Sequence, residues 1–156
     1  MKKIVVGITG ASGTIYGIRL LEALAQDSSV ETHLVMSRWA KENLAIENTG
    51  YTEKEVRELA DVVYDDRDMG ASIASGSFQH DGMVIVPASM KTVAGIATGL
   101  ADNLIARAAD VTLKERRPLL LVPRESPFNQ IHLENMLKLS RMGVDIIPPI
   151  PAFYNN

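Results

Sequence analysis

Short apolar runs alternate along the chain with segments in which apolar residues recur every three or four positions. Residues 4–9 are rich in β-branched side chains and predict a buried strand, whereas residues 14–26 have helical spacing. The alternation continues to the end of the chain. It predicts further strands over 32–36, 83–86, 119–122 and 144–147, and helices over 38–46, 52–60, 90–98, 103–116 and 126–143. Residues 64–77 show little periodicity and predict loop with a short helix.

Two local signals mark helix starts. Thr52 followed by Glu55 is a capping box. Ser126 followed by Pro127 predicts an N-cap and a first helical residue, and Gly143 is typical of the position after a helix end.

The alternation of strands and helices determines the predicted fold class. Strands joined by helical crossovers form a parallel sheet, and both faces of such a sheet are covered. We therefore expect residues 1–156 to form a single α/β domain with a doubly wound, mostly parallel sheet, Rossmann-like or flavodoxin-like. Ligands bind such sheets at the carboxyl ends of the strands, so the residues directly after each strand are the candidates for function.

Composition narrows the classes of function. The 156 residues carry a formal net charge of −3, which disfavours nucleic acid because its binding usually needs a basic face. No apolar run approaches the length that spans a membrane, and no signal-peptide pattern follows Met1. The chain contains no cysteine, which excludes disulfides and thiolate metal sites. We expect a soluble cytoplasmic protein.

A glycine-rich turn, GITGASGTIYG at residues 7–17, follows the first predicted strand. It has neither the G-x-G-x-x-G spacing of dinucleotide folds nor the G-K-[ST] of a triphosphate loop. The second strand ends in Met36-Ser37-Arg38, where a dinucleotide site would place an acid. Two alternatives remain. The turn offers free N–H groups to one anion, with Ser12 adding a hydroxyl, or its glycines only permit close packing.

Short hydroxyl side chains follow the other strands. Ser37, Ser89 and Thr92 suit a phosphorylated, sugar-like tail such as that of FMN, although serine after a strand is also a common helix cap.

A second group of charged residues predicts another anion site. Arg107 and Lys114 are seven residues apart in one predicted helix and share a face, while Arg124 and Glu125 follow a strand. Such cations would clamp a second phosphate beside a carboxylate that acts as acid or base. The alternative is an ordinary solvated helix end at 114–117.

Several segments, in order over essentially the whole chain, resemble the UbiX/Pad flavin prenyltransferases. They are TGASG (9–13), VMSRWA (35–40), ASGSF (74–78), PASMKT (87–92), RAADVTLKERRPLLLVPRE (107–125), IHLENMLKLS (131–140) and PPIPAFYN (148–155). The block at 107–125 is the most specific. The similarity is greatest to the branch associated with hydroxyarylic acid decarboxylases.

The resemblance implies an enzyme that transfers a dimethylallyl group from dimethylallyl phosphate to N5 and C6 of reduced FMN without a metal ion. The product, prenylated FMN, would serve a UbiD-type decarboxylase as its cofactor. The resemblance also implies a homododecamer with sites between subunits. The alternative function is an FMN-binding carrier or accessory subunit without chemistry of its own. A related cysteine-peptide decarboxylase is disfavoured, because such enzymes use a C-terminal cysteine loop and this chain has no cysteine.

Carried onto this sequence, the resemblance assigns a role to individual residues. The flavin site would comprise Gly10, Ala11, Ser12, Ser37, Ser89, Met90, Lys91, Thr92 and Arg124, with Ser12 near N5. The allyl phosphate would contact Arg107, Lys114, Arg124 and Tyr154. Catalysis would rest on Ser12, Glu47, Lys114 and Glu125, with the two glutamates as candidates for moving protons.

Two features depart from the family pattern. Trp39 stands where many relatives have a small residue, and we interpret it as a subunit contact rather than a residue that stacks near the flavin. Relatives continue into a further C-terminal helix that carries another basic contact to the allyl phosphate, whereas this sequence ends at Asn156.

Other polar signals predict no site. The run YDDRD at 64–68 lacks the remaining ligands of a calcium loop and is interpreted as a solvated turn. His33, His80 and His132 have no ligand spacing to one another, so no metal is expected.

Overall fold

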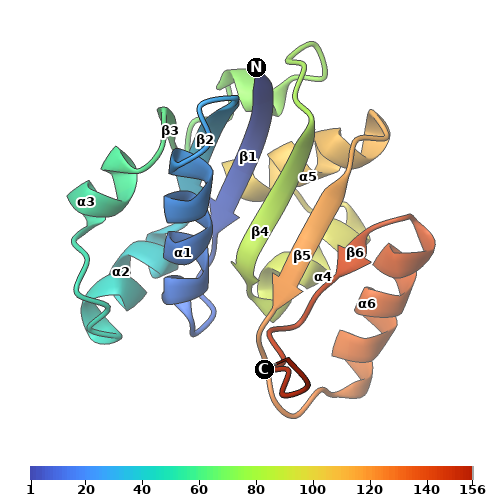
Figure 1. Ribbon diagram of the computed structural model, residues 1–156. Helices are drawn as coiled ribbons and strands as arrows, with labels where there is room; N and C mark the ends of the chain where they lie inside the picture. The colour runs from blue at the N-terminus through green and yellow to red at the C-terminus, as the bar shows by residue number, and fades with distance from the viewer. Residues whose placement is uncertain (156) are drawn as a thin grey trace.

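Six strands form one parallel sheet in the order β3-β2-β1-β4-β5-β6 (Figure 1). The computed structural model describes residues 1–155, so Asn156, the end of the predicted domain, lies outside the described residues. The strands are β1 (Lys2–Ile8), β2 (Val30–Met36), β3 (Val62–Asp65), β4 (Gly82–Ala88), β5 (Leu119–Pro123) and β6 (Asp145–Ile146).

Helices cover both faces of the sheet (Figure 1). They are α1 (Thr14–Ala25), α2 (Arg38–Ile46), α3 (Glu53–Glu58), α4 (Met90–Thr98), α5 (Leu104–Lys114) and α6 (Gln130–Arg141), with a short 3-10 helix η1 (Ser72–Ala74). The first three pack on one face, and α4, α5 and α6 pack on the other. The predicted doubly wound fold is confirmed.

The sheet separates two hydrophobic cores because successive strand residues point to opposite faces. Val5 and Val35 enter the core beneath α4 and α5, whereas Val6 and Leu34 enter the core beneath α1 and α2. All four are fully buried. Burial on both faces explains why these strands read as continuous apolar runs rather than as alternating ones.

The prediction that residues 64–77 begin as loop was wrong at their start. Val62–Asp65 forms β3, which pairs with β2 from His33 to Met36. The strand lies at the edge of the sheet and is only partly buried, so it does not need a continuous apolar sequence. The Tyr64 hydroxyl, which hydrogen bonds His33 Nδ1 at 2.8 Å, ties it to the sheet.

Helix α6 begins at Gln130, three residues after Pro127, the first helical residue that the sequence predicted. Asn129 is the N-cap instead. Its side chain accepts a hydrogen bond from the His132 N–H (2.9 Å), and His132 Nδ1 accepts one from the Asn129 N–H (3.2 Å). This reciprocal pair satisfies two N–H groups at once and therefore outweighs the upstream signal. Gly143, with a φ of +89°, follows the helix end as predicted.

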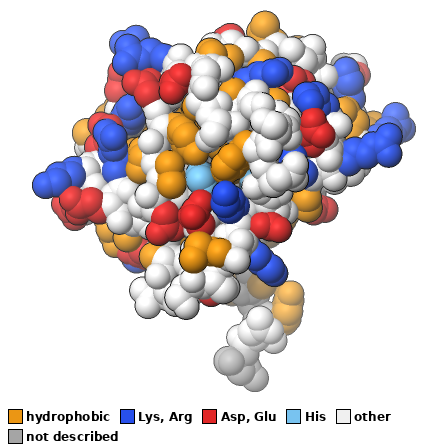
Figure 2. Space-filling model, turned by 90° about the horizontal axis from the view of Figure 1, so that it is seen from above, with side chains coloured by type: hydrophobic (Ala, Val, Ile, Leu, Met, Phe, Trp, Pro, Cys, Tyr) orange, Lys and Arg blue, Asp and Glu red, His pale blue; other side chains and the backbone are white. Residues whose placement is uncertain are grey.

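The order of the strands reverses between β1 and β4, where the two halves of the sheet meet. The carboxyl ends of β1, β2 and β4 consequently lie next to one another, at the lower edge of the sheet in Figure 1. The face above the opposite edge carries interspersed acidic and basic side chains, and forms no continuous basic surface (Figure 2). None of the helices described is long and apolar enough to cross a membrane.

Gly17 allows α1 to lie directly on the sheet. A Cβ at this position would lie 2.6 Å from the Val86 carbonyl oxygen and 2.9 Å from Ile8 Cδ1. Alanine is the better helix former by about 1 kcal/mol. We nevertheless expect Gly17→Ala to lower the free energy of unfolding by about 1–3 kcal/mol, because a strand backbone cannot move aside cheaply.

Urea unfolding at one protein concentration measures this change. Arg19→Ala, at an exposed position of the same helix, is the control and should shift the free energy of unfolding by less than about 0.5 kcal/mol. A Gly17→Ala protein at least as stable as the unmodified one would contradict the close approach.

Candidate functional site

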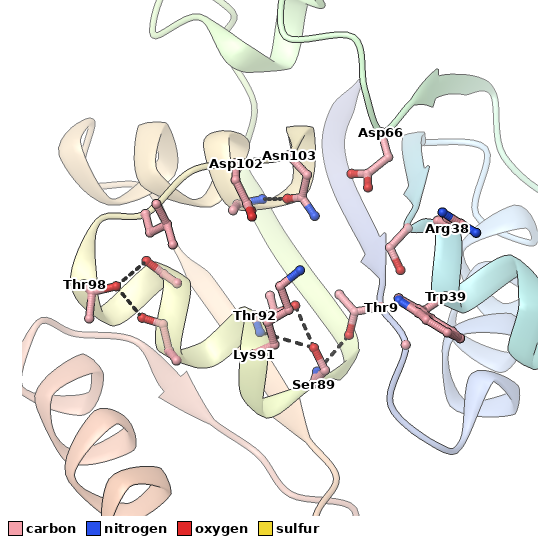
Figure 3. A pocket seen from close by; sticks show the side chains of 16 residues that line it. Thr9, Arg38, Trp39, Asp66, Ser89, Lys91, Thr92, Thr98, Asp102 and Asn103 are labelled. Atoms are coloured by element: carbon pink, nitrogen blue, oxygen red, sulfur yellow. Dashed lines mark hydrogen bonds between the residues drawn. The ribbon is translucent and has the colours of Figure 1, made fainter.

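A cavity of about 520 Å³ opens at the carboxyl ends of β1, β2 and β4 (Figure 3). This volume is typical of sites for small organic ligands, which span about 300–1,000 Å³. Five of the residues predicted for the flavin site line it, namely Gly10, Ser37, Ser89, Lys91 and Thr92. The structure therefore brings together side chains from three separate strand ends, as the predicted fold requires.

The N-terminus of α2 begins at the cavity wall. Ser37 is the N-cap, and its Oγ accepts a hydrogen bond from the Ala40 N–H at 3.1 Å. Within residues 1–155 nothing accepts from the N–H groups of Arg38 and Trp39 or from the Ser37 hydroxyl. Free N–H groups at a helix N-terminus attract an anion, and the Ser37 proton adds a further donor.

The N-terminus of α4 is arranged in the same way. Ser89 Oγ accepts from the Thr92 N–H (3.2 Å) and hydrogen bonds the Thr92 hydroxyl (2.9 Å). One hydroxyl proton bridges this pair, which leaves the other for a ligand. The Ser89 N–H donates to Thr9 Oγ1 (2.8 Å), which donates to the Pro87 carbonyl (2.7 Å). Thr9 is buried and has both bonds satisfied, so it holds the loop in place.

The N-terminus of α5 also reaches the cavity but has no spare donors. The Leu104 N–H donates to the Asp66 carbonyl (2.8 Å) and the Ile105 N–H donates to Asp66 Oδ1 (3.3 Å). Asn103 Oδ1 accepts from the Ala106 N–H at 2.9 Å. An anionic ligand group therefore fits α2 and α4 rather than α5.

Asp66 was interpreted as part of a solvated turn, and that interpretation was wrong. Its side chain lines the cavity together with Asp102 and Asn103, residues that sequence reasoning did not single out (Figure 3). Burial raises the pKa of Asp66. The sequence does indicate Asn103 as a helix cap. Its proximity to Asp66 depends on the tertiary structure, which places the segment after β3 next to the start of α5.

The N-terminus of α1, which the glycine-rich turn predicted as a free anion site, is already filled. Glu47 Oε2 accepts from the Gly13 N–H (2.7 Å) and the Ser12 hydroxyl (3.2 Å). Glu47 Oε1 accepts from the N–H and hydroxyl of Thr14 at 3.3 and 3.0 Å. The carboxylate at the end of α2 supplies the anion itself. The structure thus pairs Ser12 with Glu47, two of the predicted catalytic residues.

These hydrogen bonds control the charge of Glu47. Burial raises the pKa of this carboxyl group, but the bonds from the backbone of Gly13 and Thr14 and from the two hydroxyls outweigh it. The net effect is a pKa below the ordinary value of a glutamate. Glu47 is therefore ionised at neutral pH and accepts a hydrogen bond from the Ser12 hydroxyl.

The predicted second phosphate clamp is not assembled within one chain. Arg107 and Lys114 do share a face of α5. Arg107 Nε donates at 3.2 Å to the carbonyl of Ala74, the last residue of η1, and Lys114 lies beside Gly76 in the loop that follows. Lys114 ends α5 just before β5 begins, whereas Arg124 follows the other end of β5. A five-residue strand is about 16 Å long, so Lys114 and Arg124 lie at opposite ends of β5.

The remaining predicted residues lie outside the cavity lining. Ala11 is buried and Met90 is half-buried, each beside a lining residue. Arg124, Glu125 and Tyr154 are exposed, and Glu125 Oε1 accepts only from the Ser126 N–H, at 3.1 Å, among the residues described. In a single chain these side chains face solvent.

Comparison with known proteins gives a consistent result. Residues 1–154 match the family described as Flavoprotein. A flavin prenyltransferase, LpdB of Lactiplantibacillus plantarum, is 66% identical over 156 residues, which cover 100% of this chain and 83% of that protein.

Two solved structures share the fold at high identity. A dodecameric FMN-dependent UbiX-like decarboxylase from Escherichia coli O157:H7 has a TM-score of 0.97 and 57% identity, covering 99% of this chain and 83% of that one. AnUbiX (PadA1) in complex with FMN and dimethylallyl pyrophosphate has a TM-score of 0.95 and 54% identity, covering 98% and 80%.

The lowered pKa of Glu47 makes its contribution to stability depend on pH. The ionised form is favoured in the folded protein, so the stabilisation is present above the ordinary glutamate pKa of about 4.3 and is lost as pH falls through the lower folded value. We expect Glu47→Gln to lower the free energy of unfolding by about 0.5–1 kcal/mol at pH 7, as for loss of a helix cap.

Urea unfolding between pH 7 and pH 3 tests this expectation. The difference between the unmodified protein and Glu47→Gln should shrink toward pH 3. Glu42→Gln, on the same helix, removes a carboxylate that is 41% exposed and pairs with the exposed Arg38, and it should show little difference throughout. A difference for Glu47→Gln that does not change with pH would contradict a stabilising carboxylate.

Proposed function

Because the chain belongs to the flavoprotein family, we propose that it is a flavin prenyltransferase. It transfers a dimethylallyl group from dimethylallyl phosphate to N5 and C6 of reduced FMN, which gives prenylated FMN. The observation that carries this proposal is the cavity where α2 and α4 present unbonded N–H groups and hydroxyls. The fold around it is shared with AnUbiX, which was solved with FMN and dimethylallyl pyrophosphate.

The cavity fits the phosphorylated tail of FMN. Ser37 and the Ser89–Thr92 pair each retain a hydroxyl proton for a phosphate or ribityl oxygen. Lys91, exposed at the wall, adds a positive charge. The acidic side chains of Asp66 and Asp102 line another part of the cavity, where they would repel the phosphate (Figure 3). This distribution of donors and acids orients the ligand.

The Ser12–Glu47 pair supplies the proton acceptor in this proposal. Prenyl transfer breaks the C–O bond of the allyl phosphate, whose electron pair leaves with the phosphate, and forms a C–N bond as N5 loses a proton. Ring closure then joins C6 to one carbon of the allyl double bond, and the other carbon of that double bond takes up a proton as C6 loses one. Ser12 donates to the ionised Glu47, so the serine oxygen is directed to receive a proton that passes on to the carboxylate. The flavin supplies the nucleophilic ring atoms, and this chain positions the base.

The departing phosphate needs cationic partners in a closed site. We propose that Arg107 and Lys114 come from one copy of the chain, and Arg124, Glu125 and Tyr154 from another. The separation of Lys114 from Arg124 by the length of β5 supports this assignment. The dodecameric state of the Escherichia coli relative supports it further. The proposal includes a homododecamer of single flavoprotein domains that acts without a metal ion.

The proposed reaction implies a recipient for its product and a location in the cell. Prenylated FMN is a cofactor rather than an end product, and a UbiD-type decarboxylase is the proposed recipient. We also propose a cytoplasmic location, since the reaction consumes a reduced flavin and the cytoplasm is a reducing compartment. Fractionation of cells that produce the protein tests this location.

Mass spectrometry of the flavin tests the activity. After anaerobic incubation of the protein with reduced FMN and dimethylallyl phosphate, the flavin should gain one prenyl unit. Glu47→Gln should bind FMN, because Glu47 lies outside the cavity lining, but should give no prenylated product. Bound FMN that remains unchanged with the unmodified protein would instead support a carrier. Equal activity of Glu47→Gln would remove Glu47 from the mechanism.

Mixed oligomers test whether the phosphate site is shared between copies. Lys114→Ala and Arg124→Ala should each be nearly inactive when produced alone. Co-expressed in equal amounts, they should regain about a quarter of the unmodified activity, since half of the sites receive each intact residue independently. No recovery in mixed oligomers would show that both cations act from the same chain, and would contradict the shared site.

A further inference from the structure

Trp39 occupies a position that the proposed roles leave unexplained. It is the second residue of α2 and the single tryptophan of the chain. Its side chain is 60% exposed, yet it lines the cavity next to Ser37. Figure 3 shows the indole on the α2 side of the cavity with its ring nitrogen toward the interior. No residue among 1–155 accepts a hydrogen bond from that nitrogen.

The glycine-rich turn holds Trp39 in this place. A Cβ at Gly10 would lie 2.5 Å from Trp39 Cβ and 3.4 Å from its Cγ, so only glycine allows the tryptophan to lie against the turn. Asn43, one turn further along α2, donates to the Gly10 carbonyl at 2.9 Å and fastens the helix to the turn. The base of the indole is therefore fixed before any ligand binds, which lowers the entropic cost of using it.

The chemistry of the indole matches its neighbours. An indole nitrogen is only a donor, and the nearest groups along α2 are the Ser37 hydroxyl and the free N–H groups of Arg38 and Trp39 itself. All of them require an oxygen acceptor. On the basis of the proposed flavin site, we infer that the Trp39 indole N–H donates to a phosphate oxygen of bound FMN. Trp39 thereby selects the phosphorylated flavin over riboflavin.

Calorimetric titration of the full chain with FMN and with riboflavin tests this role. Trp39→Phe keeps an aromatic ring but loses the donor. It should weaken FMN binding about tenfold, the effect of one hydrogen bond to a charged group, and change riboflavin binding by less than about twofold. Leu133→Ala removes an exposed apolar side chain outside the cavity and should leave both affinities unchanged.

Four results would overturn the inference. Unchanged FMN affinity in Trp39→Phe would show that the indole N–H has no ligand partner. An equal loss for FMN and riboflavin would show a contact with the ring or ribityl chain instead. A lower native mass of Trp39→Leu with unchanged FMN affinity would make the residue a subunit contact. If the unmodified protein binds neither flavin, the flavin site itself is wrong and this assignment fails with it.

Discussion

The need to satisfy the first N–H groups of each helix organises this molecule. Helices α1, α2, α4 and α5 begin near the carboxyl ends of β1, β2 and β4, and each leaves N–H groups that cannot bond within the helix. Glu47 accepts from the Gly13 and Thr14 N–H groups at the start of α1, while Asp66 and Asn103 accept from the first three N–H groups of α5. Single serine caps on α2 and α4 satisfy only part of the requirement. The cavity lies where α2 and α4 keep unbonded donors, which favours an anionic ligand there.

The balance between burial and hydrogen bonds at the helix N-termini also gives two carboxylates, Glu47 and Asp66, opposite shifts in pKa. Glu47 is held ionised by hydrogen bonds that outweigh the effect of its burial, whereas burial dominates at Asp66 and raises its pKa. A helix N-terminus stabilises a negative charge only as far as N–H groups and hydroxyls point at it. Glu47 receives four such bonds, including that of Ser12. The residue that completes α1 is thus also the base proposed for the reaction.

The sheet itself imposes the second constraint. Every strand of a parallel sheet runs in the same direction, so the residue before β5 and the residue after it lie at opposite ends of the strands within one chain. Lys114 and Arg124 are separated in this way, although only a few residues lie between them in the sequence. A site that uses both must combine two copies. In the proposed enzyme, assembly is then part of the chemistry, because it is proposed to bring the cations of one subunit to the flavin cavity of another.

The sequence by itself determined every strand except β3, the helical segments, the parallel doubly wound fold and the serine caps beside the cavity. These features depend on periodicity and on side chains within three or four residues of each other. The start of α6 also depends on local interactions. Asn129, rather than Ser126, is the N-cap because it forms a reciprocal capping box with His132.

Only the tertiary structure decided how distant residues share the helix N-termini. Glu47 reaches Gly13 across 34 residues, and Asp66 reaches Ile105 across 39. The edge strand β3 and the cavity wall at Trp39 depend in the same way on which segments the sheet brings together. Such contacts form because folding of the sheet brings distant segments together and places a carboxylate or a glycine next to its partner. The sequence pattern within either segment does not indicate which distant residue it will contact.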